Sequence, residues 1–458
     1  MKVLICGAGQ VGFGIAERLS AENNDVSIID NEASLIQRVS DMLDVRGFVG
    51  HGSHPDVLDD AGARDADMII AVTLHDEVNM VACQVAHSLF NIPTKIARVR
   101  AQSYLEPHWR DLFSREHMPI DVIISPEIEV GDMVLRRLSL PGAFETVSFG
   151  DGLISVVGVT CEEDCPVVDT PLKQLTELFP DLPAVVVAVV REGNLFVPHG
   201  GDQLLAGDDA YFVAPNDQVE RTLKIFGHDE QQAQRVIIAG GGNIGLYVAR
   251  RLEELHGSTH LKLIETGRER AVEIAEQLNK TVVLNGSALD EEVLKEADVT
   301  SADTMVALTN DDQVNILSCI MAGRLGCLRS LCLLNTRSYT EMVRSLGINA
   351  SINPRLITVS RVLQHVRRGR IKAVHSIQNG AGEVIEAEAL ETSPLVGKPL
   401  REIDLPDGLR VGAVLRDGEV RIPDGSLQID AHDRVIMFAT AENVREVEQM
   451  FRVSLEFF

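Results

Sequence analysis

Two glycine-rich stretches of this chain have the residue types and the spacing of a phosphate-binding turn. GAGQVG occupies residues 7–12, and GGGNIG occupies residues 240–245. In such a turn the first glycine lets the chain leave a strand sharply, the second lets a phosphate approach the backbone, and the third lets the next helix pack close to the sheet. The helix that opens there directs free N–H groups and its positive dipole end toward the phosphates. Both stretches therefore point to nucleotide binding.

An acidic residue follows each turn at the distance expected of a ribose ligand. Asp30 ends the apolar run after the first turn, and Glu265 ends the run after the second, each about 20 residues beyond the last glycine. A carboxylate there hydrogen-bonds a ribose diol and repels the additional phosphate of NADP. The two acids favour a nucleotide that lacks this phosphate.

Other polar residues stand where strands of the expected sheets end, which is where ligands bind in such sheets. Thr73 and Thr309 occupy matching places and could donate to a phosphate or a ribose, whereas Asn79 and Asn315 could instead cap a loop or a helix. Arg98, at the end of the fifth strand, could reach a phosphate.

The second half differs from the first at two of these places. The counterpart of Arg98 falls near Asn335, and the loop GSALDEEVL from Gly286 carries two more residues than GSHPDVL from Gly52. Two interpretations of the second half stay open: a second nucleotide site, or a degenerate copy retained for packing.

Metal chemistry and catalysis find little support in the sequence. His51 and His54 stand in an expected loop with no third ligand nearby, so surface or adenine-edge roles are favoured over a metal pair. The close cysteine pairs 161/165 and 327/332 have no histidine partner at zinc spacing, which favours reduced, mostly buried thiols. We expect no metal site and no catalytic residue.

The elements that must position these residues alternate between apolar strands and amphipathic helices. In the first half, strands are expected at 3–7, 25–30, 45–50, 67–73, 95–100 and 121–125, with helices at 12–19, 33–39, 55–61, 77–89 and a connecting helix at 127–139. The second half repeats this order, with strands at 236–240, 261–265, 281–285, 304–309, 330–334 and 350–354. Six strands that alternate with helices predict a parallel sheet covered on both faces.

The chain is an internal duplication. VLICGAGQVGFGIAERL (3–19) returns as VIIAGGGNIGLYVARRL (236–252), and CPVVDTPLKQL (165–175), from a shorter segment, returns as SPLVGKPLREI (393–403). The sequence therefore predicts an α/β protein with two tandem Rossmann-like, doubly wound parallel sheets, each followed by a small α+β domain. The expected boundaries are 1–125, 126–228, 232–353 and 354–458.

Charge and hydropathy restrict the setting in which the chain works. The net charge is −26 and the pI about 4.9, which argues against binding to nucleic acid or to an anionic lipid surface and permits a partner with a basic face. The sequence shows no signal peptide and no run of about 18 apolar residues that could span a bilayer. We expect a cytoplasmic protein.

Longer strings identify a family resemblance. GAGQVG (7–12), GHGSHP (50–55), DEVNMVACQVAHSLFN (76–91), GGGNIG (240–245) and LTNDDQVNI (308–316) resemble the peripheral, cytoplasmic subunits of bacterial Trk potassium-uptake systems. In that family two RCK-type units, each with an N-terminal nucleotide domain and a C-terminal domain, are fused in one chain. The resemblance extends over essentially the whole length.

The resemblance implies regulation of a transport protein. Such a subunit binds NAD⁺ or NADH and ATP or ADP, assembles as a homotetrameric ring, and controls a membrane-embedded Trk-type potassium channel from the cytoplasmic face of the inner membrane. The candidate binding residues carried onto this sequence are Gly7, Ala8, Gly9, Gln10, Val11, Gly12, Asp30, Gly52, Ser53, Thr73, Leu74 and Arg98, and in the second half Gly240, Gly241, Gly242, Asn243, Ile244, Gly245, Glu265, Gly286 and Thr309. Many second units of the family carry Gly-Asp-Ala-Ser/Thr at the third strand, whereas Ser287 follows Gly286 here. This departure implies a second site that is weaker, altered in preference or empty.

Two competing functions remain open. An NAD-dependent oxidoreductase with duplicated nucleotide domains would consume NADH with a defined substrate, but the smaller segments show no acid–base arrangement. A duplicated scaffold with relict glycine turns would bind no adenine nucleotide below millimolar concentration.

Overall fold

The computed structural model describes residues 1–179, 182–230, 232–255, 259–366 and 371–451. Within them, two compact units are built from alternating parts of the chain: residues 1–132 with 236–366, and residues 133–235 with 367–451. The first unit contains both nucleotide-type domains and the second contains both small modules. The linear boundaries expected from the sequence stay predictions, and residues 452–458 of the last one lie outside the described residues.

Each nucleotide-type domain is a six-stranded, wholly parallel sheet in the order 3-2-1-4-5-6 of a Rossmann fold. The first has strands β1 (Lys2–Cys6), β2 (Asp25–Asp30), β3 (Arg46–Val49), β4 (Met68–Ala71), β5 (Thr94–Arg98) and β6 (Val122–Ile124). Its helices are α1 (Gln10–Ala21), α2 (Ala33–Met42), α3 (Pro55–Asp60), α4 (Asp76–Phe90) and the connecting helix α5 (Pro126–Ser139). The elements expected from the sequence are confirmed, with ends displaced by a few residues.

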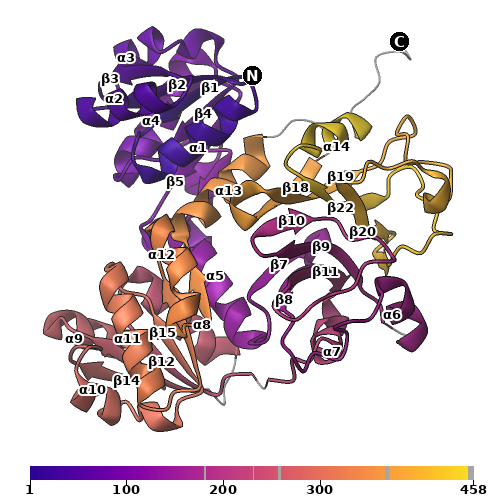
Figure 1. Ribbon diagram of the computed structural model, residues 1–458. Coiled ribbons are helices and arrows are strands. Elements are labelled where there is room, and N and C mark those ends of the chain that lie inside the picture. The colour runs from indigo at the N-terminus through magenta and orange to yellow at the C-terminus, as the bar shows by residue number, and fades with distance from the viewer. Residues whose placement is uncertain (180–181, 231, 256–258, 367–370, 452–458) are drawn as a thin grey trace. The chain divides into compact units, whose positions relative to one another are not determined.

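The second domain repeats the strands and main helices of the first (Figure 1), except that α12 stands where the first domain has a 3₁₀ helix at Gln102–Leu105. Its strands are β12 (Arg235–Ala239), β13 (His260–Glu265), β14 (Val282–Asn285), β15 (Thr304–Ala307), β16 (Arg329–Leu333) and β17 (Ala350–Ile352). Its helices are α8 (Asn243–Leu255), α9 (Arg268–Gln277), α10 (Glu291–Glu296), α11 (Asp312–Arg324), α12 (Arg337–Met342) and the connecting helix α13 (Pro354–Val366).

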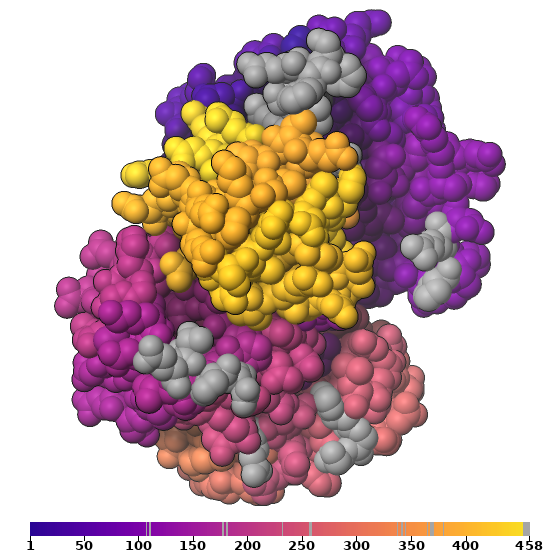
Figure 2. Space-filling view, turned by 90° about the vertical axis from the view of Figure 1, so that its right-hand side faces the viewer, coloured from indigo at the N-terminus to yellow at the C-terminus, as the bar shows by residue number. Residues whose placement is uncertain are grey.

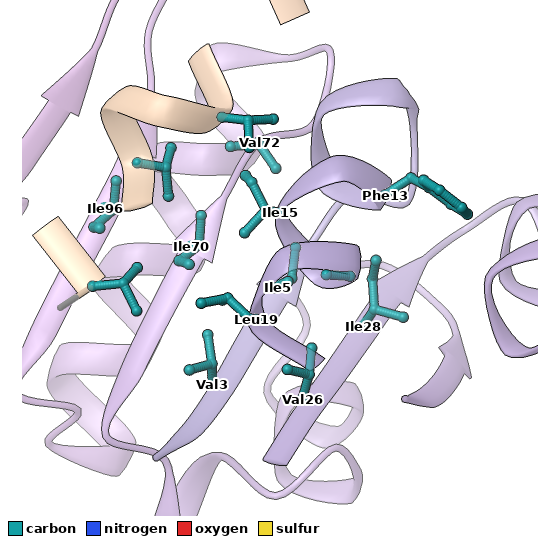
Figure 3. Packing of buried hydrophobic residues seen from close by; sticks show 14 of the residues in the cluster. Val3, Ile5, Phe13, Ile15, Leu19, Val26, Ile28, Ile70, Val72 and Ile96 are labelled. Atoms are coloured by element: carbon teal, nitrogen blue, oxygen red, sulfur yellow. The ribbon is translucent and has the colours of Figure 1, made fainter. Parts of the chain in front are cut away.

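The sheet strands are short and almost wholly apolar because helices cover both faces. MIIA of β4 and VLIC of β1 are buried throughout, as is usual for central parallel strands. In Figure 3, Val3 and Ile5 of β1, Ile28 of β2 and Ile70 of β4 pack together beneath α1. Residues of α13, namely Val359, Val362, Leu363 and Val366, belong to the same core, so a helix of the second half closes the first domain.

The small modules are five-stranded antiparallel sheets with one topology. The first has β7 (Glu145–Phe149), β8 (Ile154–Thr160), β9 (Val185–Arg191), β10 (Asn194–Phe196) and β11 (Asp209–Pro215), with helices α6 (Leu172–Leu178) and α7 (Val219–Ile225). The second, orange to yellow in Figure 2, has β18 (Ile371–Ile377), β19 (Gly382–Glu388), β20 (Leu409–Arg416), β21 (Glu419–Arg421) and β22 (Arg434–Thr440), with helix α14 (Val444–Met450). Val213 and Ile436 belong to one apolar cluster shared by the two sheets. The predicted α/β class with an α+β satellite after each large sheet is confirmed.

None of the helices in the described part of the chain combines the length and the apolar character needed to cross a bilayer.

Candidate nucleotide site

The first glycine turn has the geometry that a bound phosphate requires. Gly7 has φ +108°, and a Cβ there would lie 2.9 Å from the backbone nitrogen of Thr73, so only glycine fits. A Cβ at Gly12 would press on the backbone of Gly7, which explains why α1 can begin so close to β1. A Cβ at Gly9 would meet no atom within 4 Å, so this face of the turn is open to a ligand.

The second turn preserves this geometry. Gly240 has φ +105°, Gly245 lies against Gly240, and Gly242 faces open space. Gly241 differs, because Arg270 Nε donates a hydrogen bond to its carbonyl oxygen at 3.0 Å. Leu35 occupies the position of Arg270 in the first half and lines an open cleft instead.

The two acids hold equivalent positions. Asp30 Oδ2 accepts the backbone N–H of Ala8 at 2.7 Å, and Glu265 Oε2 accepts that of Gly241 at 2.8 Å. Each second oxygen accepts a backbone N–H two residues further on, at 2.9 Å in Asp30 and 2.8 Å in Glu265. These bonds fix each carboxylate beside its glycine turn, where a ribose would lie.

Thr73 and Asn79 form a bridge across the carboxyl end of the first sheet. Asn79 Oδ1 accepts both the backbone N–H of Thr73 at 2.8 Å and its hydroxyl at 2.7 Å, and Asn79 Nδ2 donates to the carbonyl oxygen of Arg98 at 2.9 Å. Thr309 and Asn315 repeat this pattern with matching distances. Each asparagine thus joins the ends of two strands, and each threonine hydroxyl is already engaged as a donor.

Two arginines distinguish the first half from the second. Asn79 binds the carbonyl of Arg98, and Asn315 binds that of Leu333, so Leu333 is the counterpart of Arg98. The expected counterpart near Asn335 is therefore moved by two residues, to Leu333. Asn335 instead matches Arg100, because the backbone N–H of Arg100 donates to Asp76 at the start of α4 and that of Asn335 donates to Asp312 at the start of α11. Neither cation has a cationic counterpart in the second half.

Arg98 and Arg100 are held differently. Arg98 Nε is buried without a hydrogen-bond partner, and burial, followed by the neighbouring Arg100, lowers the pKa of Arg98. Arg100 Nε donates to Glu127 Oε1 at 2.8 Å, and Glu127, in the first turn of α5, is almost fully buried. The Nε of Arg98 is thus unsatisfied, whereas the guanidinium of Arg100 is bound to the connecting helix.

The loop after the third strand needs a second correction. Gly50 and Gly286 both donate their backbone N–H to the carbonyl oxygen of the preceding acid, Asp30 at 2.9 Å and Glu265 at 3.0 Å. Gly286 is therefore the counterpart of Gly50 and not of Gly52, and the two loops have the same length. The predicted two-residue insertion was wrong, because Gly50, and not Gly52, follows the third strand of the first half as Gly286 follows the third strand of the second.

A cleft of about 490 Å³ lies at this edge of the first sheet, within the usual range of small-molecule sites. Ten of the candidate residues line it: Gly7, Gly9, Gln10, Val11, Asp30, Gly52, Thr73, Leu74, Arg98 and Ile244. Ala8, Gly12 and Ser53 do not line it, and neither do the second-half candidates apart from Ile244.

The cleft also contains residues that the sequence did not single out. Arg100 and Glu127 come from the first half, and Arg355 and Thr358 come from the second. The Ser125-Pro126 and Asn353-Pro354 pairs, which precede the two connecting helices in the sequence, were a usable signal for residues 127 and 355, because both helices begin at this edge.

The other candidate chemistries do not converge on a reactive centre. The rings of His51 and His54 stack at 4.9 Å, and within the described ranges no group of three His, Cys, Asp or Glu side chains is arranged to hold a metal. All seven cysteines are buried and unpaired as disulfides. Burial, and then Asp30, raise the pKa of Cys6, beneath the turn, to about 12, which keeps it an unreactive thiol.

Comparison with known families identifies the class of protein. Residues 3–126 and 236–354 match the TrkA-N domain, and residues 156–227 and 384–452 match the TrkA-C domain. The chain belongs to the family of proteins built from paired TrkA-N and TrkA-C domains.

Individual proteins show which members of this family and which solved structures the chain resembles. The chain is 65% identical over 458 residues, and over the full length of both proteins, to the Trk system potassium uptake protein TrkA of Azorhizobium caulinodans. It also resembles a GsuK channel structure bound to NAD, with 17% identity, a TM-score of 0.60, and coverage of 98% of this chain and 78% of that one. A GsuK structure bound to ADP matches with 14% identity, a TM-score of 0.50, and coverage of 80% and 69%. The structural neighbours share the fold.

Proposed function

We propose that this chain is a nucleotide-sensing regulatory subunit of a Trk-type potassium uptake system and catalyses no reaction. It works as a tetrameric ring on the cytoplasmic face of the inner membrane, where it gates a membrane-embedded potassium channel. Its full-length similarity to a Trk system potassium uptake protein supports the system, and the cleft beside Gly7 supports the ligand.

The observation that carries the ligand class is that Asp30 and Arg98 line one cleft beside an open glycine turn. The carboxylate of Asp30 is suited to a ribose diol, and the unsatisfied guanidinium of Arg98 is suited to a phosphate. NAD⁺, NADH, ATP and ADP share an adenosine joined to a pyrophosphate, so all four satisfy both groups. The GsuK structures bound to NAD and to ADP are consistent with this class.

We expect the two halves to differ in affinity for the pyrophosphate. The second half retains Glu265 and an open face at Gly242, but Leu333 and Asn335 replace the two arginines. Arg270 additionally occupies the carbonyl of Gly241. The first half is therefore the tighter site for ATP and ADP, and the second half binds through its ribose acid alone.

The pair Arg100–Glu127 offers a route from the nucleotide to the rest of the subunit. A phosphate that enters the cleft competes with Glu127 for Arg100, and Glu127 stands in the first turn of α5. The helix α5 leads from the first nucleotide domain into the first small module. A ligand can shift a ring between two shapes only by its difference in affinity for them, and a usual coupling of about 1–3 kcal/mol changes gating roughly 5- to 150-fold.

An NAD-dependent oxidoreductase is the competing function, and no observation in the cleft favours it. The described side chains there that can transfer a proton, such as His51 and His75, form no hydrogen-bonded pair with a nucleophile. The pure protein should therefore leave NADH unchanged in the presence of small carbonyl substrates.

The testing experiment is calorimetric titration with NADH, NAD⁺, ATP and ADP on the wild type, Asp30→Ala and Glu265→Ala. We expect D30A to remove the tight class of ATP and ADP sites, and E265A to remove only a weaker class. Potassium flux through the reconstituted complex should then respond to these nucleotides in the wild type and lose its response in D30A. Absence of binding to the wild type would refute the sensor function.

A further inference from the structure

Each connecting helix packs against the first helix of the other nucleotide domain. Helix α13 lies on α1 (Figure 1), and its residues Val359 and Val362 belong to the same core as Phe13 of α1. Helix α5 meets α8, where the hydroxyl of Tyr247 donates to Asp132 Oδ1 at 2.7 Å. The two helix crossings are equivalent by the internal duplication, because α1 corresponds to α8 and α5 corresponds to α13.

At the first crossing a glycine accepts a bulky side chain. A Cβ added to Gly14 would lie 3.0 Å from Val359 Cγ2 and 3.2 Å from Arg355 Nε, closer than such atoms usually approach. Gly14 lies outside the phosphate turn and within α1. At this crossing the glycine is on α1, and the larger side chains are on the connecting helix.

At the second crossing the two sizes are exchanged. A Cβ added to Gly131 in α5 would lie 2.7 Å from Tyr247 Cε1, so the tyrosine ring rests on the glycine. Burial, and then the hydrogen bond to Asp132, raise the pKa of Tyr247 to about 12, as expected of a ring held in this contact. At this crossing the large side chain, Tyr247, is on α8, and the glycine, Gly131, is on the connecting helix.

The four residues occupy equivalent positions in the duplicated sequence. Gly14 aligns with Tyr247 in the two strand–glycine–helix strings, and Gly131 aligns with Val359 after the Ser-Pro and Asn-Pro pairs. Each crossing therefore combines one glycine with one large residue. A glycine within a helix costs about 1 kcal/mol in local propensity, so neither glycine is explained by the helix itself.

We propose that the side-chain sizes of these four residues determine which halves pack together. They favour packing between the two halves of one chain and disfavour packing of either half against the like half of a second copy. If two first halves paired, Gly14 would face Gly131 and leave a void. If two second halves paired, Tyr247 would face Val359 and overlap. Voids and overlaps are both unfavourable in a close-packed contact, so only the first-with-second pairing satisfies both crossings.

The experiment is thermal unfolding of the full chain, free of nucleotide, with variants at the first crossing. Gly14→Tyr should lower the unfolding midpoint by roughly 4–10 °C, and adding Val359→Gly should recover most of that loss. Adding Tyr247→Gly to G14Y should lower the midpoint further, because this change removes the bulky side of the other crossing. The matched control is Gly323→Tyr, since Gly323 is an exposed glycine in α11 with no atom within 4 Å of an added Cβ, and it should leave the midpoint unchanged or raise it.

Variants with smaller side-chain changes test the proposal if G14Y does not fold. Gly131→Ala should lower the midpoint, whereas Gly323→Ala, at the exposed control position in α11, should not lower it. The proposal is overturned if G14Y or G131A matches the wild type, or if V359G fails to recover G14Y. It is equally overturned if Tyr247→Gly leaves the midpoint of G14Y unchanged, because the second crossing would then contribute nothing to the pairing of the two halves.

Discussion

Replacing Arg98 by leucine, the residue that the second half carries at the equivalent place, should have two opposite effects. It removes the guanidinium that we assign to the nucleotide phosphates, and it removes a buried Nε that has no hydrogen-bond partner. We therefore expect Arg98→Leu to weaken nucleotide binding while stabilising the unliganded protein.

The loss of binding follows from the strength of a charged hydrogen bond. A hydrogen bond to a charged group contributes about 1.5–3 kcal/mol, which corresponds to roughly 10- to 150-fold weaker binding of ATP or ADP. Adenosine has no phosphate and should bind R98L and the wild type equally. The difference between the two ligands isolates the contribution of Arg98.

The gain in stability follows from the cost of the unsatisfied nitrogen. Leaving a buried donor without a partner costs about 1–3 kcal/mol, and each kcal/mol corresponds to about 2–4 °C in Tm for a domain of 150–250 residues. Leucine at the end of β5 removes this cost, and Leu333, at the end of β16, is buried in the equivalent place. R98L should therefore raise the Tm of the free protein by a few degrees.

The assay is calorimetric titration with ATP, ADP and adenosine, together with thermal unfolding of the free protein. Arg46→Leu is the matched control, because it makes the same change in net charge at an exposed ion pair with Asp25. Unchanged affinity of R98L for ATP and ADP would refute the placement of the phosphates. Equal loss of adenosine and ATP binding would show that the variant disrupts the cleft as a whole.

Four further substitutions test the glycine turn, a carboxylate and a buried ion pair. Gly7→Ala should lower the free energy of unfolding by about 2 kcal/mol, because φ is +108° there, whereas Gly9→Ala, which meets no atom, should retain stability in chemical denaturation and lose nucleotide affinity. Burial opposes ionisation of Glu253, but a threonine hydroxyl and three backbone N–H donors outweigh it and lower the pKa of Glu253 to about 2. The ionised Glu253 therefore contributes to the free energy of unfolding above pH about 4.5, and this contribution is lost as the pH falls toward 2. Glu253→Gln should make the free energy of unfolding depend less on pH between about 4.5 and 2. An unchanged pH dependence would contradict the lowered pKa of Glu253. Arg416→Met should destabilise the second small module by about 3–5 kcal/mol in urea, because it leaves the buried carboxylate of Asp433 unpaired; a loss below 1 kcal/mol would show that water satisfies Asp433.

The alignment of the two halves at the ends of the third and fifth strands depends on hydrogen bonds that the sequence does not show. The register of GHGSHPDVL against GSALDEEVL is fixed by backbone N–H donation from Gly50 and Gly286 to the carbonyls of Asp30 and Glu265. The register of Arg98 against Leu333 is fixed by asparagine amides that span two strand ends. Both registers depend on hydrogen bonds between segments far apart in sequence, so side-chain similarity alone placed them two residues away.

The sequence by itself determined the local features: two strand–glycine–helix openings, an acid at the end of each second strand, the alternation of strands and helices, and the duplication. These follow from backbone freedom at glycine and from hydrophobic periodicity, which act over a few residues. Only the tertiary structure decided that Glu127 holds Arg100, that residues of the second half line the first cleft, and that Gly14 meets Val359 while Gly131 meets Tyr247. Those contacts join residues separated by up to several hundred positions, and long-range packing of the two connecting helices brings them together.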